Sequence, residues 1–469
     1  MTRRLTPLLL LALGCQGPDV GGSRRPDRAP PVVARRTAPT ALPTVVPVAA
    51  TGPAAPHGKL DLPELWDIAL VNNPAVREAG ADVQAARARL LQAGLYPNPR
   101  FRFSQDTIGS AIARPGNSAF EVNQEIVTAG KRKLDVAVAG REVSFAEVGL
   151  TGRKFEALTR IRRSYYDYLT LWEVLKGYEE TVAALEKGVE ATRKQVETAK
   201  TRPQTDLLRL EALLAEARIN RDRTGDALRG AWRQLAAEVG VDDLPPAAEV
   251  GELPPTPPAW DHTAILRQAL ATNSTIRQAA VEADRARVAV DRARAGAIPN
   301  VVVGGGYNAD RTDQTSGGMV NVEVPLPLWD RQQGKVREAE AKFAAAQAAA
   351  RGAETKLTRD VAEAFARYSA ARRQVERTEA DVLPRLRESV TLLRKAFEAG
   401  GAQVTFADVL TTEQSLLSAR ITLAEARRAL WQAVADLQGL MQLDVAEGLR
   451  PPDWNARPNP PLPGKTRAP

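Results

Sequence analysis

Two segments of this sequence, roughly 200 residues apart, follow the same pattern, and so long a period indicates a duplicated domain rather than a solenoid. Ala69–Pro74 recurs as Ala269–Ser274, and Leu95–Asn98 recurs as Ala297–Asn300. Each copy is predicted to fold as a helix, two short strands, a very long helix, a sharp break and a helix of intermediate length. The chain is therefore expected to contain two similar units, each combining helices with a pair of strands.

Four segments alternate apolar and polar residues with a period of two, which is typical of half-buried strands. They are 99–108 and 118–126 in the first copy, and 300–308 and 320–324 in the second, where Val320–Glu323 matches Val122–Glu125. Runs of about 9–10 residues are long enough to cross a bilayer at a tilt. Two hairpins in a soluble domain would show the same alternation, so the strands alone leave both interpretations open.

Long helices are predicted at Lys131–Lys200 and Gly334–Ala399, where apolar residues recur every three, four or seven positions. This spacing is typical of coiled coils. At about 1.5 Å per residue, such a helix spans on the order of 100 Å, far more than a compact domain needs. Pro384 is expected to kink or locally unwind the second helix, because proline lacks the amide proton and crowds the preceding turn.

Four shorter helices can be combined to the same length. Asp206–Gly240 and His262–Ala297, each about 35 residues, are expected to stack end to end and match one long helix. Gln403–Leu440 is expected to stack in the same way on Leu62–Leu95. Each chain would then contribute four long rods, with paired strands at one end and tight helical turns at the other.

The amino terminus predicts export. Arg3 and Arg4 precede the apolar run Leu8–Leu13, and a small residue precedes Cys15, which is the pattern of a signal peptide rather than of a membrane span. Cys15 is the only cysteine and resembles the acceptor of a bacterial lipoprotein signal. A lipidated Cys15 would anchor the chain to a membrane without spanning it.

Composition divides the rest of the chain. A Pro/Ala-rich linker and a Pro-rich tail, expected to be disordered, flank the two repeats. The predicted segments are 1–15 as the lipoprotein-type signal peptide, 16–58 as the linker, 59–250 as the first repeat, 251–446 as the second repeat and 447–469 as the tail.

Charge and residue inventory exclude several functions. The net charge of +8 is mild, the long helices interleave Glu with Arg, and no basic-aromatic platform is present, so no nucleic-acid partner is expected. The two histidines, His57 and His262, lie in the linker and at a helix start, without metal-ligand spacing, a nucleophile–base set or a phosphate loop. One cysteine and three methionines provide no soft-metal relay. We therefore expect no enzyme activity, no cofactor and no resident metal.

Four strands cannot close a barrel. An open sheet edge in hydrocarbon leaves backbone groups unpaired at several kcal/mol each, so strands in a membrane must be completed by other copies. Two copies would give eight strands with a filled interior, and three would give twelve, wide enough for a lumen. A membrane location therefore requires an oligomer.

Three segments carry a family resemblance: Gln124–Lys133, Val324–Lys335 and Lys395–Ala419. With them the chain resembles the outer membrane efflux protein family of TolC-like exit ducts, above all its heavy-metal-efflux lipoprotein branch. The resemblance covers both halves, over residues 60–445. It implies a mainly α chain with membrane β structure, in which four strands per chain form a trimeric twelve-stranded outer-membrane barrel continuous with a long periplasmic helical barrel.

The same resemblance implies the function and the partners. The homotrimer would lie in the outer-membrane lipid and extend into the periplasm. It would passively conduct substrates, heavy-metal cations among them, that an inner-membrane proton-driven pump expels through a periplasmic adaptor, the membrane fusion protein.

Site residues are also implied. In the family, acidic residues just beyond the second tip turn line the closed end of the tunnel. Asp408 stands at the first such position, Thr411 stands where some members have a second Asp, and Asp206 holds the comparable place in the first half. Six carboxylates per trimer would favour cations near the constriction. Both aspartates also lie in the first turn of a helix, where its dipole favours them in any case.

The adaptor-docking tips and the strand-to-helix turns complete the expected sites. The docking residues are Arg202, Pro203, Gly400, Gly401, Ala402 and Val404. Their glycines would suit a tight helix cap equally well. Gly130 and Gly334 are expected to let the backbone turn from strand into helix.

Two other functions stay open at this point. The chain could be an exported, lipid-anchored structural coiled coil with two soluble hairpins. It could also be the periplasmic adaptor of a similar pump, although an adaptor would be expected to carry one helical hairpin rather than a duplicated unit.

Overall fold

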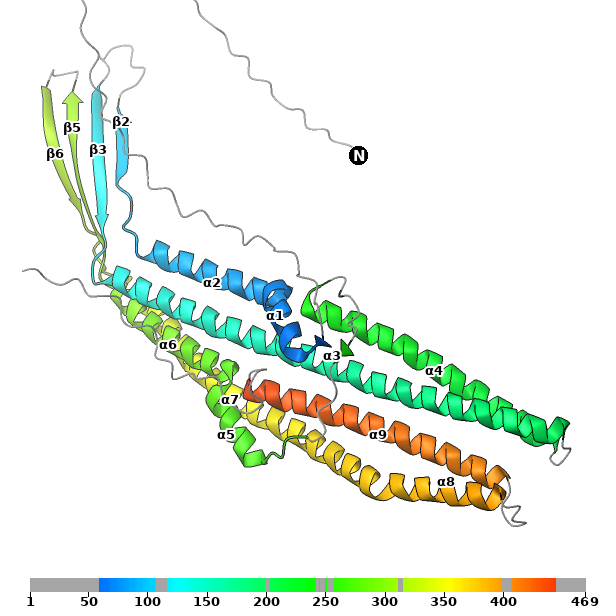
Figure 1. Cartoon of the computed structure of the whole chain (residues 1–469). Coiled ribbons are helices and arrows are strands. Elements are labelled where there is room, and N and C mark those ends of the chain that lie inside the picture. Colours follow the sequence, from blue (N-terminus) through cyan, green and yellow to red (C-terminus); the bar gives the residue numbers. More distant parts are fainter. Residues whose placement is uncertain are drawn as a thin grey trace, which may run out of the picture. The chain divides into compact units, whose positions relative to one another are not determined.

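The computed structural model consists of helices running side by side, with a four-stranded sheet beyond their ends (Figure 1). It describes residues 59–106, 116–198, 203–241, 244, 249–250, 257–310, 315–398 and 406–443. All of them belong to one compact unit, Pro53–Pro469. Cys15, Arg202, Gly400, Gly401, Ala402 and Val404 lie outside the described residues.

The first repeat contains β1 (Lys59–Leu60), α1 (Leu62–Asn72), α2 (Pro74–Ala93), β2 (Arg100–Gln105), β3 (Asn117–Ile126), α3 (Lys131–Glu197), α4 (Gln204–Val239) and β4 (Glu249–Val250). The second contains α5 (His262–Thr272), α6 (Ser274–Ala295), β5 (Val301–Asp310), β6 (Thr315–Glu323), α7 (Gln333–Arg377), a π-helical turn (Thr378–Val382), α8 (Leu383–Glu398) and α9 (Phe406–Met441). The short strands β1 and β4 pair in parallel, apart from the main sheet.

Both long helices form as predicted. The first, α3, runs unbroken for 67 residues. The second is interrupted by the π-helical turn directly before Pro384, where the amide of Leu383 reaches back five residues to the carbonyl of Thr378. Because proline cannot donate to the carbonyl four residues back and its ring crowds that carbonyl, the wider turn accommodates it. The predicted local unwinding at Pro384 is confirmed.

The main sheet has the strand order β2-β3-β5-β6, with every neighbouring pair antiparallel. The central pair, β3 and β5, joins the two repeats, so β2 and β6 are the open edges. The four predicted strands are all present with shifted ends. The largest shift is in β6, which begins at Thr315 because the Ser-Gly-Gly segment pairs with β5 although it lacks apolar alternation. With Pro97 and Pro299 aligned, the strand pairing sets Val122 in correspondence with Val322, two residues beyond the Val320 of the sequence match.

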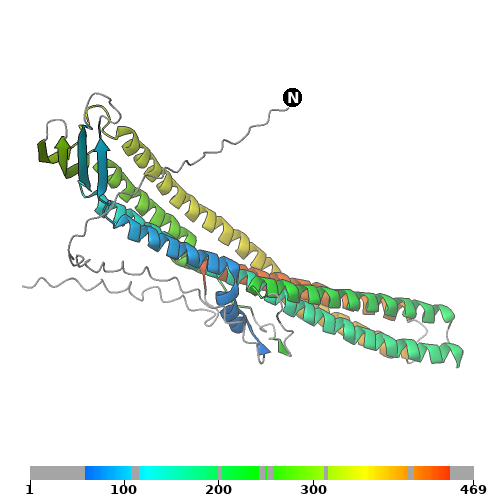
Figure 2. The same cartoon turned by 90° about the horizontal axis from the view of Figure 1, so that it is seen from above.

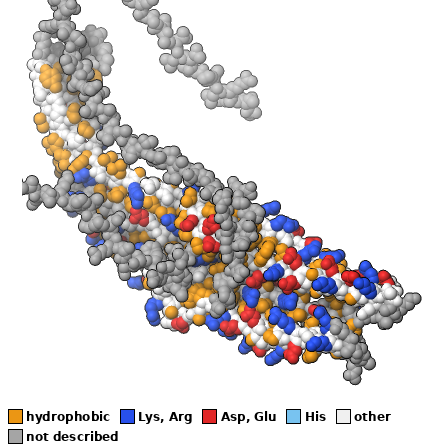
Figure 3. Space-filling view, in the orientation of Figure 1, with side chains coloured by type: hydrophobic (Ala, Val, Ile, Leu, Met, Phe, Trp, Pro, Cys, Tyr) orange, Lys and Arg blue, Asp and Glu red, His pale blue; other side chains and the backbone are white. Residues whose placement is uncertain are grey.

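The two faces of the sheet differ in polarity. Side chains of directly paired residues share a face. One face is largely apolar, and most of its large apolar side chains are more than a third exposed; Figure 3 shows hydrophobic groups on this sheet. Those side chains are Phe101, Phe103, Phe120, Val122, Ile126, Val303, Tyr307, Val320 and Val322. In an isolated chain this apolar face remains uncovered by the described residues.

The predicted stacking of the shorter helices was wrong. The C-terminal end of α4 meets the start of α2 within the first repeat, and that of α9 meets the start of α6 within the second. Figures 1 and 2 show α4 continuing the line of α2 along α3. The prediction had exchanged the partners, because stacking lengths alone do not distinguish the helices of one repeat from those of the other.

The helices predicted at 62–95 and 262–297 are each broken, at Asn73 and Asn273. Both asparagines have an extended backbone, with ψ of 122° and 125°. Each caps the helix that follows it by accepting from backbone amides with its side-chain oxygen. In the first repeat Pro74 reinforces the break, because the residue before a proline avoids the helical conformation.

The main core lies where α1, α3, α5, α7 and α9 meet. Its fully buried members include Leu65, Ile161, Ile265, Val361, Val434 and Leu437. Ile161 and Val361 occupy corresponding places in the two long helices, and both are 0% exposed. The core is thus at the middle of the helices, away from the sheet.

Candidate functional site

The polar face of the sheet carries alternating charges. Arg100 faces Glu125 and Arg102 faces Glu121, each pair at 4.0 Å between nitrogen and oxygen. The arginine side chains are 82% and 69% exposed, so these contacts contribute little to stability and the charges remain available to other groups. Glu323 lies on the same face near the end of β6.

An amide bridge crosses the middle of this face. Asn321 on β6 donates from Nδ2 to Oδ1 of Asn123 on β3 at 2.9 Å. The two side chains meet above Gly304 on the intervening strand, where a Cβ would overlap both amide oxygens. The glycine in this strand is therefore required by a contact between its two neighbours.

The first strand-to-helix junction joins the two repeats. Gly130 takes a left-handed conformation, with φ of 66°, immediately before α3. Lys131 follows it, is buried, and donates from Nζ to the carbonyl of Ile298 and, at 2.6 Å, to Oδ1 of Asn300. Burial, together with the nearby Arg292, lowers the pKa of Lys131. The side chain of Thr128 donates to the carbonyl of Pro299 at 2.6 Å. The junction between β3 and α3 is therefore hydrogen-bonded to the segment that precedes β5 in the second repeat.

At the second junction the left-handed residue is Gln332, with φ of 59°, and Gly334 is the second residue of α7. The expected turn at Gly334 is corrected accordingly. The backbone amide and the side-chain amide of Gln332 both donate to Asp330, at 2.8 and 3.2 Å. These two bonds hold a residue other than glycine in the left-handed region.

The predicted constriction residues lie near the starts of two helices, α4 and α9. Asp206 is half-buried in the first turn of α4, and Pro203, which precedes α4, is exposed. Asp408 is exposed in the first turn of α9, and Thr411 is exposed one turn later. Leu410 packs against the cluster between α3 and α4 that contains Leu207. This contact links the N-terminal part of α9 to the apolar cluster between α3 and α4 within one chain.

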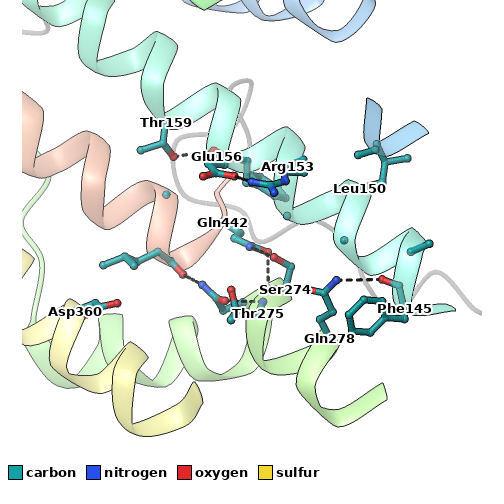
Figure 4. A pocket seen from close by; sticks show the side chains of 18 of the residues that line it. Phe145, Leu150, Arg153, Glu156, Thr159, Ser274, Thr275, Gln278, Asp360 and Gln442 are labelled. Atoms are coloured by element: carbon teal, nitrogen blue, oxygen red, sulfur yellow. Dashed lines mark hydrogen bonds and ion pairs between the residues drawn. The ribbon is translucent and has the colours of Figure 1, made fainter. Parts of the chain in front are cut away.

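A groove of about 1210 Å³ lies between α2, α3, α6, α7 and α9, and the sequence interpretation missed it. Figure 4 shows its lining, where Gln442 and Ser274 exchange two hydrogen bonds. The bonds run from the amide of Ser274 to Oε1 of Gln442 at 3.0 Å, and from Nε2 of Gln442 to Oγ of Ser274 at 2.6 Å. Gln442 has a φ of 53° and follows the end of α9.

Close backbone approach shapes the same groove. A Cβ at Gly152 on α3 would lie 2.7 Å from Oγ of Ser274 on α6. Charges there are paired, since Asp436 on α9 contacts Arg163 on α3 at 2.6 Å and Arg367 on α7 at 3.2 Å. Beside this groove the end of α9 meets the start of α6 at Asn273. The recurrence of asparagine at positions 73 and 273 was the sequence signal that could have predicted this contact.

The described part of the chain lacks two features, a cluster of metal-binding side chains and an apolar membrane-spanning helix. There, no three His, Cys, Asp or Glu side chains are grouped so that they could hold a metal ion. Across the same residues, no helix combines the length and the apolar character needed to cross a bilayer.

The chain was compared with known proteins. The model of the family described as "Outer membrane efflux protein" matches residues 65–241 and 265–441, about three quarters of the chain. The cobalt-zinc-cadmium resistance protein CzcC of Cupriavidus metallidurans is 24% identical over 420 residues, covering 87% of this chain and 95% of CzcC.

Solved structures show the same fold. The structure of CusC, described in terms of folding and transmembrane channel formation, superposes with a TM-score of 0.67 at 19% identity, over 81% of this chain and 91% of CusC. The outer membrane protein VceC of Vibrio cholerae superposes with a TM-score of 0.66 at 20% identity, over 81% of this chain and 95% of VceC.

Proposed function

Because the chain belongs to the outer membrane efflux protein family, we propose that it is the outer-membrane exit duct of a tripartite efflux system. In this role it passively conducts substrates that an inner-membrane proton-driven pump delivers through a periplasmic adaptor. Neither a structural coiled coil nor an adaptor subunit is needed to account for the duplicated family match.

The observation that carries this proposal is the sheet. It has one exposed apolar face, one polar face and two open edges. In hydrocarbon both edges must be paired, and three copies of four strands close a twelve-stranded barrel with room for a lumen. The apolar face would then contact lipid and the polar face would line the lumen.

The sites and the cargo are proposed on narrower support. The name of CzcC favours cobalt, zinc and cadmium ions as cargo. We place Asp408, Asp206 and Thr411 at the tunnel constriction, because Asp206 and Asp408 lie in the first turns of the helices that follow the two tip turns. The helical tips, from Arg202 to Pro203 and from Gly400 to Val404, would dock the adaptor, and Cys15 would carry the lipid anchor.

The test is conduction by the purified protein. The detergent-solubilised chain should migrate as a trimer and form stable channels in planar bilayers. Val320→Lys, on the apolar face near the middle of β6, should abolish channel insertion, because a charge facing lipid costs about 2–4 kcal/mol per copy near the bilayer centre. Ser104→Lys on the polar face is the matched control and should insert normally. A monomeric parent chain without conductance would contradict the proposal.

A further inference from the structure

The connection between β6 and α7 is longer and more exposed than its counterpart in the first repeat. Residues 127–130 connect β3 to α3, whereas 324–332 connect β6 to α7. In the shorter connection, the side chain of Thr128 is hydrogen-bonded to the segment before β5. In the longer one, which we call the Trp329 loop, three large apolar side chains are 75%, 60% and 85% exposed: Leu326, Leu328 and Trp329.

The Trp329 loop continues the apolar face of the sheet. Val320 and Val322 belong to that face, and Val324 follows at the same spacing directly after the end of β6. The proposed function places this face against lipid, so the loop lies where the barrel leaves the hydrocarbon and the helices begin. Tryptophan is enriched at this depth in membrane proteins, because its ring is apolar and its N–H group stays hydrated.

Internal hydrogen bonds hold the loop in this shape. The amide of Leu328 donates to the carbonyl of Leu326 at 2.9 Å, and Nε2 of Gln333 donates to the carbonyl of Trp329 at 3.0 Å. The two prolines of the loop have no amide proton, so the loop cannot extend β6 as a hydrogen-bonded strand. The Trp329 loop therefore presents side chains, rather than backbone groups, to whatever covers it.

Basic side chains lie directly after the apolar ones. Nε of Arg331 donates to the carbonyl of Pro327 at 3.3 Å, which keeps the guanidinium beside the loop. Lys335 is exposed in the first turn of α7. The acidic residue of the loop, Asp330, accepts two hydrogen bonds from Gln332. Positive charge is thus available next to the exposed apolar side chains.

We propose that the Trp329 loop docks an anionic phospholipid of the periplasmic leaflet, with its apolar side chains among the acyl chains and with Arg331 and Lys335 at the headgroup phosphate. This inference rests on the proposed function, because it requires the sheet to lie in the outer membrane. Guanidinium and ammonium groups bind phosphate through charge-assisted hydrogen bonds. Basic residues next to an apolar anchor are attracted to anionic lipid surfaces, so the loop prefers a headgroup of net negative charge.

Fluorescence quenching by brominated lipids tests whether Trp329 meets lipid. In nanodiscs, brominated phosphatidylglycerol should quench a component of the tryptophan emission that is missing from Trp329→Phe. The control Trp172→Phe removes a tryptophan that is 54% exposed on α3, roughly 60 Å along the helix from its start, and should retain this component. Equal quenching of the parent and Trp329→Phe would show that lipid does not reach the loop and would overturn the inference.

The charge of the headgroup tests Arg331 and Lys335. In nanodiscs that mix phosphatidylglycerol with phosphatidylcholine, quenching of the parent should be at least about twofold stronger when the brominated lipid is phosphatidylglycerol. Arg331→Gln combined with Lys335→Gln should remove this difference. Lys335→Gln alone, which leaves the hydrogen bond of Arg331 within the loop intact, should reduce it.

The matched control for charge is Arg351→Gln combined with Lys356→Gln. It removes the same two charges from exposed positions about 30 Å farther along α7, and should keep the preference for phosphatidylglycerol. A parent that is quenched equally by the two brominated lipids would contradict the proposed recognition of an anionic headgroup.

The possible results separate this inference from the proposed function. A trimer that conducts, but whose Trp329 is not quenched by lipid, would exclude the lipid site and leave the duct standing. Dissociation of the trimer in detergent by Trp329→Ala would show that a second copy covers the loop, and would also exclude the lipid site. A parent chain that neither trimerises nor conducts would overturn the proposed function.

Discussion

Asn73 donates a hydrogen bond from Nδ2 to the carbonyl of Glu238 at 2.7 Å, and so ties the end of α4 to the start of α2. Its Oδ1 simultaneously accepts from the amide of Val76, capping α2. In the second repeat Asn273 makes the corresponding bond to Leu440 at 3.0 Å. One asparagine per repeat therefore joins two helices end to end into a rod as long as its neighbour.

Asn73→Ala and Asn273→Ala should each lower the free energy of unfolding by about 1–3 kcal/mol, because each removes a helix cap and leaves a carbonyl without its donor. Chemical denaturation of the detergent-solubilised protein measures the change. Asn220→Ala, within α4, is the control and should stay within about 0.5 kcal/mol of the parent. Equal stabilities for the three variants would show that these joints do not hold the rods together.

Gly240→Ala should be strongly destabilising. Gly240 has a φ of 85°, and a Cβ there would lie 2.8 Å from the carbonyl oxygen of Asn72. The left-handed conformation alone costs a residue with a side chain about 1–2 kcal/mol, and the backbone of α1 would also have to move. Gly140→Ala, inside α3 with nothing within 4 Å, should instead gain up to about 1 kcal/mol. Thermal unfolding of the two variants should therefore shift in opposite directions.

The chain should lose stability in alkaline solution, partly through Tyr166. Burial raises the pKa of the Tyr166 phenol, with Arg162 acting in the opposite direction. In the unfolded chain the phenol releases its proton near pH 10, whereas in the folded chain it holds the proton to a higher pH. Its contribution is therefore fully present below pH 10 and is lost as the pH rises through the folded pKa.

Tyr166→Phe should reduce the slope of unfolding free energy against pH above pH 10, while leaving the slope at pH 7 unchanged. The measurement is denaturant unfolding across this pH range. The same slope in parent and variant above pH 10 would exclude Tyr166 as a contributor.

Asp408→Ala should lower cation selectivity and weaken divalent block in planar bilayers, because three carboxylates would be removed from the constriction of a trimer. Asp222→Ala, which removes a carboxylate that is 66% exposed and lies farther along α4, should leave conduction unchanged. If Asp408→Ala conducts like the parent, this carboxylate only stabilises the first turn of its helix and does not act on the conducted ions.

Local patterns were sufficient to predict the elements. Period-two alternation in segments such as 118–126 identified the strands, and uninterrupted apolar spacing identified α3, because side-chain periodicity follows backbone geometry directly. Pro384 was sufficient to predict the distortion of the second long helix, because its missing amide proton removes a hydrogen bond to the preceding turn. Duplication and fold class could therefore be predicted from the sequence alone.

Contacts between segments distant in the chain were decided by the folded structure alone. The hydrogen bonds of Asn73 and Asn273 select which helices stack, and the bonds of Gln332 to Asp330 place the second turn before Gly334. The hydrogen bond between Asn123 and Asn321 above Gly304 likewise requires three strands in register. The length of a helix depends on residues that are close together in the sequence. The stacking of helices, the position of the second turn and the strand register depend instead on which polar groups meet after packing, so only the tertiary structure decides them.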